Sequence, residues 1–347
     1  MIRIGIIGAG GMGNAQAREF GKVDGCKVVA VCDVDRRKAE AVARAHKIRR
    51  VYADVDELLA KANVDAVSNV TPDVLHKSVA LRAIAAGKHI LSEKPLATNF
   101  ADADEMARAA EKAGVINMVN FSYRGSAAIQ HARKLVSDGV VGTVRHVDAT
   151  YFQSWLAAKV WGDWRTSPGW LWRLSTAHGS QGALGDIGVH ILDFAGYPVG
   201  DYASVQCRLK AFDKAENNRV GEFTLDANDS ALIIAEFRNG AMGTIQATRW
   251  ATGYQNRLAL HVFGDKGAIR LNLDTAWNVL EVTTGDDIHT VTWTTLELDP
   301  TPNNYERFVK SIQTGVNDQP DFRRGADIQK VLGACFESDR TGRAVGV

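Results

Sequence analysis

Residues 2–13 read Ile-Arg-Ile-Gly-Ile-Ile-Gly-Ala-Gly-Gly-Met-Gly, a short apolar run that passes directly into a cluster of glycines. A helix-compatible segment follows over residues 14–22, and a second apolar run, Cys26–Cys32, ends at Asp33. Asp33 lies 20 residues beyond Gly13. This order of strand, glycine turn, helix, second strand and closing acid is the fingerprint of a dinucleotide-binding βαβ unit. The start of the chain therefore predicts a nucleotide-binding parallel sheet.

Each glycine of this loop has an expected task. Gly8 permits the tight turn, Gly10 lets the backbone approach a pyrophosphate, and Gly13 lets helix and strand pack closely. Gly11 and Met12 lie between them, so that backbone amides and the helix dipole face the phosphates. Like a single G-x-G-x-x-G motif anywhere, this loop would be weak evidence without the strand and helix around it.

Asp33 bears on the choice of cofactor. A carboxylate at the end of the second strand accepts hydrogen bonds from the adenosine ribose and repels a 2′-phosphate. Arg36 and Arg37 favour the opposite choice if they pair with that phosphate, and are solvated helix residues otherwise. The sequence favours NAD and leaves NADP open.

Composition sets the class of protein. The 347 residues suffice for two domains, and 46% hydrophobic and 23% charged residues are typical of a soluble globular protein. A net charge of +1 gives no basis for nucleic-acid or membrane binding, and no apolar run approaches the ~20 residues of a membrane span. The first strand lacks the features of a signal peptide. The four scattered cysteines form no metal or disulfide pattern, so we expect a reducing cytoplasm.

The pattern of elements changes along the chain. Helices and strands alternate up to about residue 120, which predicts a doubly wound parallel sheet of the α/β class. After Tyr123 strand-like stretches separated by turns such as Asn239-Gly240 predict an α+β domain on a large, mainly antiparallel sheet. We therefore expect a dinucleotide-binding domain over 1–122 and a substrate-binding and oligomerisation domain over 123–347. Its C-terminal helices, 303–314 and 323–340, could pack back on the first domain.

The segment Ser92-Glu93-Lys94-Pro95-Leu96 ends the fifth expected strand. A lysine there, beside the expected nicotinamide, can hydrogen-bond a substrate oxygen and stabilise an alkoxide. Pro95 would fix the turn, with a cis bond before it as one way of doing so. The alternative is an ordinary exposed lysine in a loop.

Asp186-Ile187-Gly188-Val189-His190 places an acid and an imidazole four residues apart. At the start of a helix both would lie on one face, where the acid can orient a histidine suited to proton transfer. The alternatives are a buried histidine satisfied by a local acid, or half of a metal site. No metal-ligand spacing is present, so we predict no metal.

Five of the eight tryptophans fall between Trp155 and Arg173. Tryptophan beside Arg165 and Arg173 suits a surface that stacks on sugar rings, and Trp172 is a candidate substrate contact. A hydrophobic core or a subunit interface would also concentrate tryptophan.

Together these motifs resemble the glucose–fructose oxidoreductase, inositol dehydrogenase and rhizopine-catabolism (Gfo/Idh/MocA) family, most clearly over residues 1–195. The resemblance implies that Lys94 and His190 are the catalytic pair, with Asp186 orienting His190 and contacting substrate. It further implies that the cofactor lies along the glycine loop and along Thr71-Pro72, His76, Glu93, Asn120 and Trp164-Arg165. It also implies that Tyr123-Arg124 borders the substrate. Gly169–Ser180 looks longer than the family's usual connection, which implies a changed pocket or subunit contact.

The resulting hypothesis is a cytoplasmic NAD(P)-dependent dehydrogenase acting on a secondary alcohol of a sugar, anhydrosugar or inositol. Two rivals stay open: an NAD-dependent glycoside hydrolase, with no net change in NADH, and a non-catalytic NAD(P)-bound sugar sensor. We expect a homodimer or homotetramer with a carbohydrate or cyclitol as its small-molecule partner.

Overall fold

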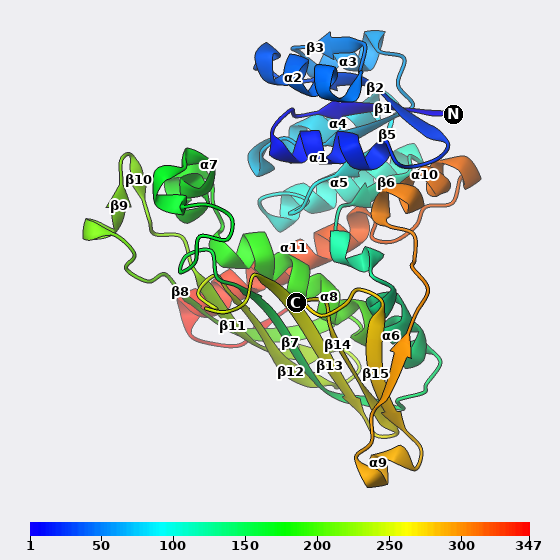
Figure 1. Ribbon diagram of the computed structural model, residues 1–347, viewed down its shortest axis with the longest axis vertical. Coiled ribbons are helices and arrows are strands. Elements are labelled where there is room, and N and C mark those ends of the chain that lie inside the picture. Colours follow the sequence, from blue (N-terminus) through cyan, green and yellow to red (C-terminus); the bar gives the residue numbers. More distant parts are fainter. The chain divides into compact units, whose positions relative to one another are not determined.

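A computed structural model gives the structure of the chain and describes residues 1–167 and 169–347 (Figure 1). Residue contacts divide it into two compact units. The first comprises Met1–Ser122 and Pro302–Gln329, and the second comprises Tyr123–Thr301 and Lys330–Val347. The helix α11 (Phe322–Thr341) contributes residues to both units.

The first unit is built on a six-stranded parallel sheet of order β3-β2-β1-β4-β5-β6. The strands are β1 (Ile2–Ile7), β2 (Cys26–Cys32), β3 (Arg50–Tyr52), β4 (Ala66–Asn69), β5 (His89–Ser92) and β6 (Asn117–Val119). Central strands are buried on both faces, which is why they read as continuous apolar runs. The order is that of a dinucleotide-binding fold, as the sequence predicts.

Helices connect these strands, and local signals in the sequence set their ends. They are α1 (Gly11–Phe20), α2 (Arg36–His46), α3 (Val55–Lys61), α4 (His76–Ala85) after the short η1 (Asp73–Leu75), and α5 (Phe100–Ala113). Asp35 caps α2 by accepting from the Arg37 amide, and Asn99 caps α5 by accepting from the Asp102 amide. Gly114 ends α5 in the left-handed conformation that glycine adopts most readily.

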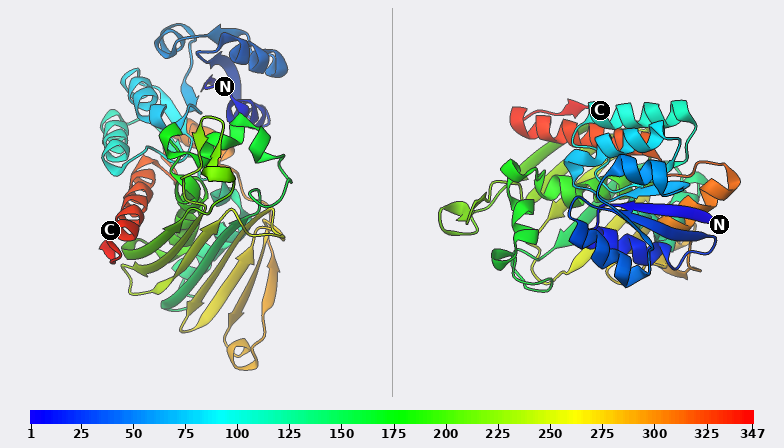
Figure 2. Two further views of the ribbon diagram at one scale, coloured as in Figure 1. Left: turned by 90° about the vertical axis from the view of Figure 1, so that its left-hand side faces the viewer. Right: turned by 90° about the horizontal axis from the view of Figure 1, so that it is seen from above.

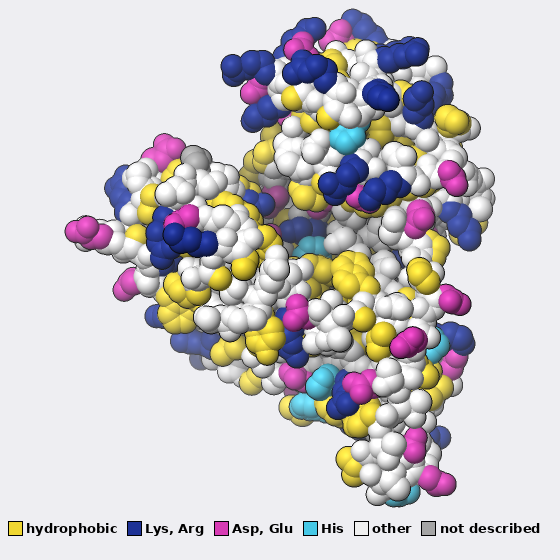
Figure 3. All heavy atoms as spheres, viewed as in Figure 1, with side chains coloured by type: hydrophobic (Ala, Val, Ile, Leu, Met, Phe, Trp, Pro, Cys, Tyr) yellow, Lys and Arg dark blue, Asp and Glu magenta, His cyan; other side chains and the backbone are white. Residues whose placement is uncertain are grey.

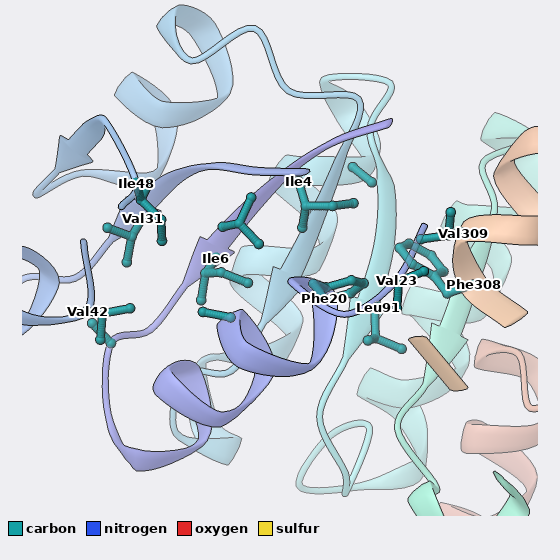
Figure 4. Close-up of a cluster of buried hydrophobic side chains, with 14 of the residues drawn as sticks. Ile4, Ile6, Phe20, Val23, Val31, Val42, Ile48, Leu91, Phe308 and Val309 are labelled. Atoms are coloured by element: carbon teal, nitrogen blue, oxygen red, sulfur yellow. The ribbon is translucent and has the colours of Figure 1, made fainter. Parts of the chain in front are cut away.

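The helix α10 (Asn304–Thr314) completes the core of the first unit. Its Phe308 and Val309 join Phe20, Val23 and the β1 side chains in one buried cluster (Figure 4). Phe20 meets Phe308 edge-on, with 6.4 Å between ring centres. Residues more than 280 positions apart therefore share one hydrophobic core.

The second unit is built on a nine-stranded sheet of order β16-β15-β14-β13-β7-β12-β11-β8-β17. Every pairing is antiparallel except that of β7 with β12. The strands are β7 (Val144–Gln153), β8 (Tyr202–Lys210), β11 (Ser230–Phe237), β12 (Met242–Thr248), β13 (Asn256–Gly264), β14 (Gly267–Asn272), β15 (Val279–Thr284), β16 (Thr294–Glu297) and β17 (Val345–Gly346). The predicted mainly antiparallel sheet is thus confirmed.

One face of this sheet is covered by α6 (Ala127–Ser137) and α8 (Val189–Val199). Strict alternation in β11 sends Ala231, Ile233 and other small or apolar side chains to that face. In Figure 2 no helix covers the opposite face of the sheet. The β11 side chains Leu232 and Ile234, which alternate with the buried ones, are 58% and 50% exposed.

Two insertions form a small lobe of their own. The first holds η3 (Trp164–Thr166), α7 (Pro168–Leu171), η4 (Trp172–Leu174) and η5 (Thr176–His178), and the second holds η7 (Glu216–Asn218), β9 (Arg219–Val220) and β10 (Phe223–Thr224). Both bury apolar side chains in one cluster that includes Trp155, Trp164 and Leu225. The short α9 (Asp287–Thr290) lies between β15 and β16. Among the described residues no helix combines the length and apolarity that crossing a membrane requires.

Candidate active site

The glycine loop is shaped by two glycines and left open by a third. Gly8 has φ +105°, and a side chain there would meet the Val70 carbonyl oxygen at 2.5 Å. A Cβ on Gly13 would overlap the carbonyl oxygen of Gly8 and lie 3.0 Å from its carbonyl carbon. A Cβ on Gly10 would meet no atom within 4 Å. Gly8 and Gly13 therefore serve the fold, whereas the space over Gly10 can admit a ligand.

The loop leads directly into the first turn of α1, whose amino end attracts anions. Gly10 is the N-cap, no side chain caps the helix, and the first turn holds no acid. Gly11 and Met12 are exposed at this end. Uncompensated amide donors and the helix dipole favour a bound phosphate.

Asp33 is held rigidly at the end of β2. Its Oδ2 accepts from the Ala9 amide at 2.7 Å, and its Oδ1 accepts from the Asp35 amide at 2.8 Å. The carboxylate is thus tied to the glycine loop itself. Arg37 is 93% exposed and lies 3.6 Å from Asp35, so it is solvated in this structure.

The segment after β4 is braced by His76. Thr71 donates its hydroxyl to Asn69 at 2.7 Å, while Pro72 is exposed. His76 is fully buried, with Nδ1 2.8 Å from the Pro95 carbonyl and Nε2 2.9 Å from the Thr71 carbonyl. Because both ring nitrogens face backbone oxygens, His76 ties two loops together. His76 thereby braces the Thr71 loop, which is expected to lie along the cofactor.

Glu93 belongs to a buried polar network. Its Oε1 accepts from Gln16 at 2.5 Å and from Asn120 at 2.8 Å, and its Oε2 accepts from the Lys94 amide at 3.2 Å. Asn120 also donates to the hydroxyl of Tyr305 at 3.2 Å. Gln16 and Tyr305 were not predicted, because neither stands in a recognisable motif. The network fixes the backbone that carries half-buried Lys94, whose bond to Pro95 is cis.

Exposed apolar side chains also gather at the ligand-binding edge of this sheet. Val34 follows Asp33 and is 92% exposed, and Val74 and Leu75 follow β4 and are 63% and 46% exposed. Met12 at the head of α1 is 49% exposed. Parallel strands of this fold bind ligands at their carboxyl ends, where such groups suit flat aromatic rings. These residues become candidate ligand contacts through their exposure in the structure, because they stand in no sequence motif.

In the second unit, Asp186 lies in η6 (Leu184–Gly188), a π-helical turn that runs into α8. The sequence predicts an ordinary helix start, and the wider turn is a correction to that expectation. Such turns are frequent at functional sites. His190 stands in the first turn of α8 and is 8% exposed, while the Asp186 side chain is 28% exposed.

Two arginines contact the Asp186 carboxylate. Arg249 donates Nη2 to Oδ2 at 2.9 Å, and the Nε of Arg173 lies 3.9 Å from the same oxygen. The Arg173 guanidinium also lies over the ring of Trp172, 4.6 Å from its centre. Half-buried Trp172 is therefore linked to Asp186 through Arg173.

Tyr123 packs edge-on against His190, with 5.0 Å between ring centres. Its hydroxyl is 2.6 Å from that of Tyr151 and accepts from Asn256 at 3.0 Å. Burial, with Tyr123 adding to it, raises the pKa of Tyr151 well above its usual value, which keeps this phenol neutral. Tyr123 is thus held in place beside His190.

Arg124, which the family resemblance places at the border of the substrate, is buried and paired with an acid. It is 2% exposed, and its Nε and Nη2 donate to Asp193 at 2.7 and 2.5 Å. Its guanidinium also covers the Tyr197 ring at 4.0 Å. These contacts give Arg124 a role in the packing of the second unit.

The tryptophan cluster divides between core and surface. Trp164 is 2% exposed and donates to the Leu156 carbonyl at 3.2 Å, so this ring packs in the core of the second unit. Arg165 is exposed and lies over Trp164 at 4.4 Å. Trp161 and Trp170 stack at 6.3 Å with an interplanar angle of 7° and remain half-buried.

Charge and metal-ligand patterns add little to this site. Lys and Arg side chains are spread over the first unit on the face in Figure 3, without a single continuous field. The described residues contain no group of three or more His, Cys, Asp or Glu side chains placed to hold a metal ion.

The sheet order, the open glycine loop and Asp33 define the first unit as a dinucleotide-binding fold of the kind that oxidoreductases use. A model of the oxidoreductase family with an NAD-binding Rossmann fold matches residues 2–121, and a model of the GFO/IDH/MocA C-terminal domain matches residues 129–270. The chain belongs to the Gfo/Idh/MocA family of NAD-binding oxidoreductases, as the sequence motifs indicate.

Relatives span most of the chain. A levoglucosan dehydrogenase from Pseudarthrobacter phenanthrenivorans is 29% identical over 297 residues, 79% of this chain and 74% of that protein. A myo-inositol 2-dehydrogenase from Thermotoga maritima is 28% identical over 270 residues, 77% of this chain and 74% of that protein. A crystal structure of an oxidoreductase domain protein from Kribbella flavida is 31% identical, with a TM-score of 0.85, covering 100% of this chain and 99% of that one. Levoglucosan dehydrogenase in complex with NADH and levoglucosan gives a TM-score of 0.88 at 26% identity, with 100% and 99% covered.

Proposed function

We propose that this protein transfers a hydride between NAD and a secondary alcohol or ketone of a sugar, anhydrosugar or inositol. The observation that carries the proposal is the open space over Gly10 at the uncapped end of α1, which fits a pyrophosphate. The relatives named as levoglucosan and myo-inositol dehydrogenases support the substrate class. Nucleotide binding is assigned to residues 1–122, and substrate binding to residues 123–347.

Lys94, His190 and Asp186 are the proposed reacting and substrate-binding groups. In the oxidation direction His190 takes the hydroxyl proton, since imidazole exchanges protons near neutrality. Lys94 stabilises the developing negative charge on the same oxygen. Asp186 accepts a hydrogen bond from a neighbouring hydroxyl. When bound, NAD supplies the hydride acceptor.

Tyr123 and Trp172 are proposed to border the sugar. Tyr123 presents a phenol fixed by Asn256, and Trp172 presents a half-buried ring beside Arg173. Aromatic faces with a few fixed polar groups suit a hydroxylated ring that is apolar on one side.

The preference for NAD over NADP is proposed to rest on Asp33. Its carboxylate is fixed by two backbone amides, so it cannot turn away from an incoming 2′-phosphate without losing both bonds. Asp33→Ser should raise the ratio of kcat/KM with NADP to kcat/KM with NAD. Arg37→Ser should leave kcat/KM with NAD unchanged. An unaltered ratio in Asp33→Ser would remove Asp33 from this role.

The direct test is a spectrophotometric screen of sugars, anhydrosugars and inositols with NAD⁺ and NADP⁺ in parallel. With any active substrate, Lys94→Ala and His190→Ala should each lower kcat by about 10²–10⁴-fold. Lys88→Ala, at the other end of β5, is the matched control and should keep wild-type turnover. Near-normal turnover of either active-site variant, with NADH binding intact, contradicts the mechanism. Glycoside cleavage without net NADH would instead favour the hydrolase.

We propose self-association through the open face of the second sheet. Leu232 and Ile234 of β11 and Met242 of β12 are 58%, 50% and 51% exposed on adjacent strands. Exposed apolar patches mark protein–protein interaction sites, and two sheets can pack face to face, so a second copy of the chain suits this surface. Light scattering should give a dimer or tetramer, and Leu232→Lys with Ile234→Lys should give a monomer. Val316→Lys, on an exposed residue of the first unit, is the control.

A cytoplasmic setting is proposed with this function. All four cysteines are free thiols, and three of them are buried. A reducing compartment suits such residues.

A further inference from the structure

Arg249 is the fully buried cation of the second unit that touches the candidate active site. It follows β12 directly, its backbone amide donates to the Asp229 carbonyl at 3.0 Å, and its side chain is 0% exposed. Arginine is rarely buried to this degree without a partner. Its partners therefore explain its position.

The guanidinium joins three segments around the π turn. Nη2 donates to the Asp186 carboxylate at 2.9 Å and to the Gly182 carbonyl at 3.2 Å, while Nη1 donates to the Arg173 carbonyl at 3.1 Å. Behind these contacts the guanidinium faces the ring of Trp155 at 5.0 Å. A planar fork that donates in several fixed directions is a property of arginine and not of lysine.

Stability alone does not account for this arrangement. Burial lowers the pKa of Arg249 below its usual value, and Asp186 opposes that shift. Replacing a buried ion pair by apolar side chains is often neutral or stabilising, because desolvation offsets the attraction. The Asp186 end of the pair is 28% exposed, so the buried cation acts on a carboxylate that a ligand can reach.

We propose that Arg249 is a positioning residue that holds the Asp186 carboxylate charged and oriented for the sugar hydroxyl, leaving proton removal to His190. An opposite charge at this distance favours the ionised carboxylate. Arg173 of η4 faces the same oxygen, and Tyr151 of β7 is the neighbouring neutral titratable group. The inference rests on the proposed function.

Kinetics of two Arg249 variants test the proposal. Arg249→Met should lower kcat at least tenfold with an unchanged NADH dissociation constant, and should move the acid limb of the kcat/KM profile to higher pH. Arg249→Lys should recover part of the loss, and guanidinium ion should restore part of the activity of Arg249→Ala. Arg145→Met is the matched control, since Arg145 pairs with Asp265 at 3.0 Å on the surface. A lower melting temperature with wild-type kcat and pH profile would show a structural role only and overturn the proposal.

A second measurement does not depend on turnover. In protein labelled with ¹³C at the aspartate carboxyls, the Asp186 signal is identified by its loss in Asp186→Asn. Its titration midpoint should rise by about one pH unit or more in Arg249→Met. An unchanged midpoint overturns the inference even if the enzyme oxidises sugars. If the midpoint rises but the protein oxidises none of the screened sugars, anhydrosugars and inositols, the proposed function is refuted. The effect of Arg249 on the Asp186 carboxylate still stands in that case. If Arg249→Met fails to fold, Arg249→Gln, which removes the charge but keeps a hydrogen-bond donor, replaces it in both measurements.

Discussion

Alanine at Gly10 and alanine at Gly13 should damage the protein in different ways. A Cβ at Gly13 lies 3.0 Å from the carbonyl carbon of Gly8 and overlaps its oxygen, whereas carbon atoms pack at about 3.5–4.0 Å. The helix α1 must therefore shift away from the Gly8 turn, which is backbone and cannot rotate aside. Overpacking costs about 1–3 kcal/mol where side chains can yield, so we expect about 3 kcal/mol or more here.

Gly10→Ala should leave the fold intact. Gly10 has φ −73°, which alanine adopts freely, and no protein atom lies within 4 Å of the added carbon. The free energy of unfolding should stay within about 0.5 kcal/mol of the wild-type value. The new methyl occupies the space assigned to the pyrophosphate, so the NADH dissociation constant should rise at least about tenfold, or 1.4 kcal/mol.

The assay pairs thermal unfolding followed by circular dichroism with NADH fluorescence titration. Gly13→Ala should lower the melting temperature by at least about 5 °C, and Gly10→Ala by almost nothing. Each variant is the control for the other. Wild-type NADH affinity in Gly10→Ala would refute the assignment of that space to the cofactor, and an unshifted melting temperature in Gly13→Ala would refute the packing argument.

Three further predictions concern stability and reactivity. Lys214→Met leaves Asp229 buried without the cation that lies 2.8 Å from it, so the free energy of unfolding should fall by about 3–5 kcal/mol in urea titrations; a loss below 1 kcal/mol would contradict this. Burial lowers the pKa of His89, whose Nδ1 accepts from the Ile116 amide at 3.0 Å, so the unfolded chain binds the proton more readily. The contribution of His89 to the free energy of unfolding is therefore complete above pH 6.5 and is lost as the pH falls below that value. The free energy of unfolding of the wild type should decline between pH 7 and 5, and His89→Asn should reduce that decline. Burial raises the pKa of Cys26 to about 11 and that of Cys32 to about 12, so both thiols should react with a disulfide reagent at pH 8 only after unfolding, and rapid native reaction would show the strand to be open.

Much of the first unit could be predicted because its information is local. Each strand is an apolar run closed by a polar residue, and caps such as Asp35 and Asn99 mark the helix starts. The glycine loop and Asp33 are adjacent in the fold through neighbouring strands, so spacing along the chain is enough to relate them.

The second unit shows where residue type stops being informative. The family resemblance assigns Arg124 and Trp164 to ligand contacts, and tertiary packing buries both side chains. The contact of Arg249 with Asp186 crosses 63 positions, and no local pattern encodes it. The π turn that carries Asp186 also has no sequence signature that separates it from an ordinary helix.

The discontinuity of the first unit limits how the chain can be cut. Phe308 and Val309 fill the same core as Phe20, although they are encoded almost 300 residues later. A fragment that stops at Ser122 would expose that apolar surface and should aggregate when expressed alone. Grafting this nucleotide-binding module onto another protein therefore requires residues 302–329 as a second segment, or a circular permutation that brings them next to Met1.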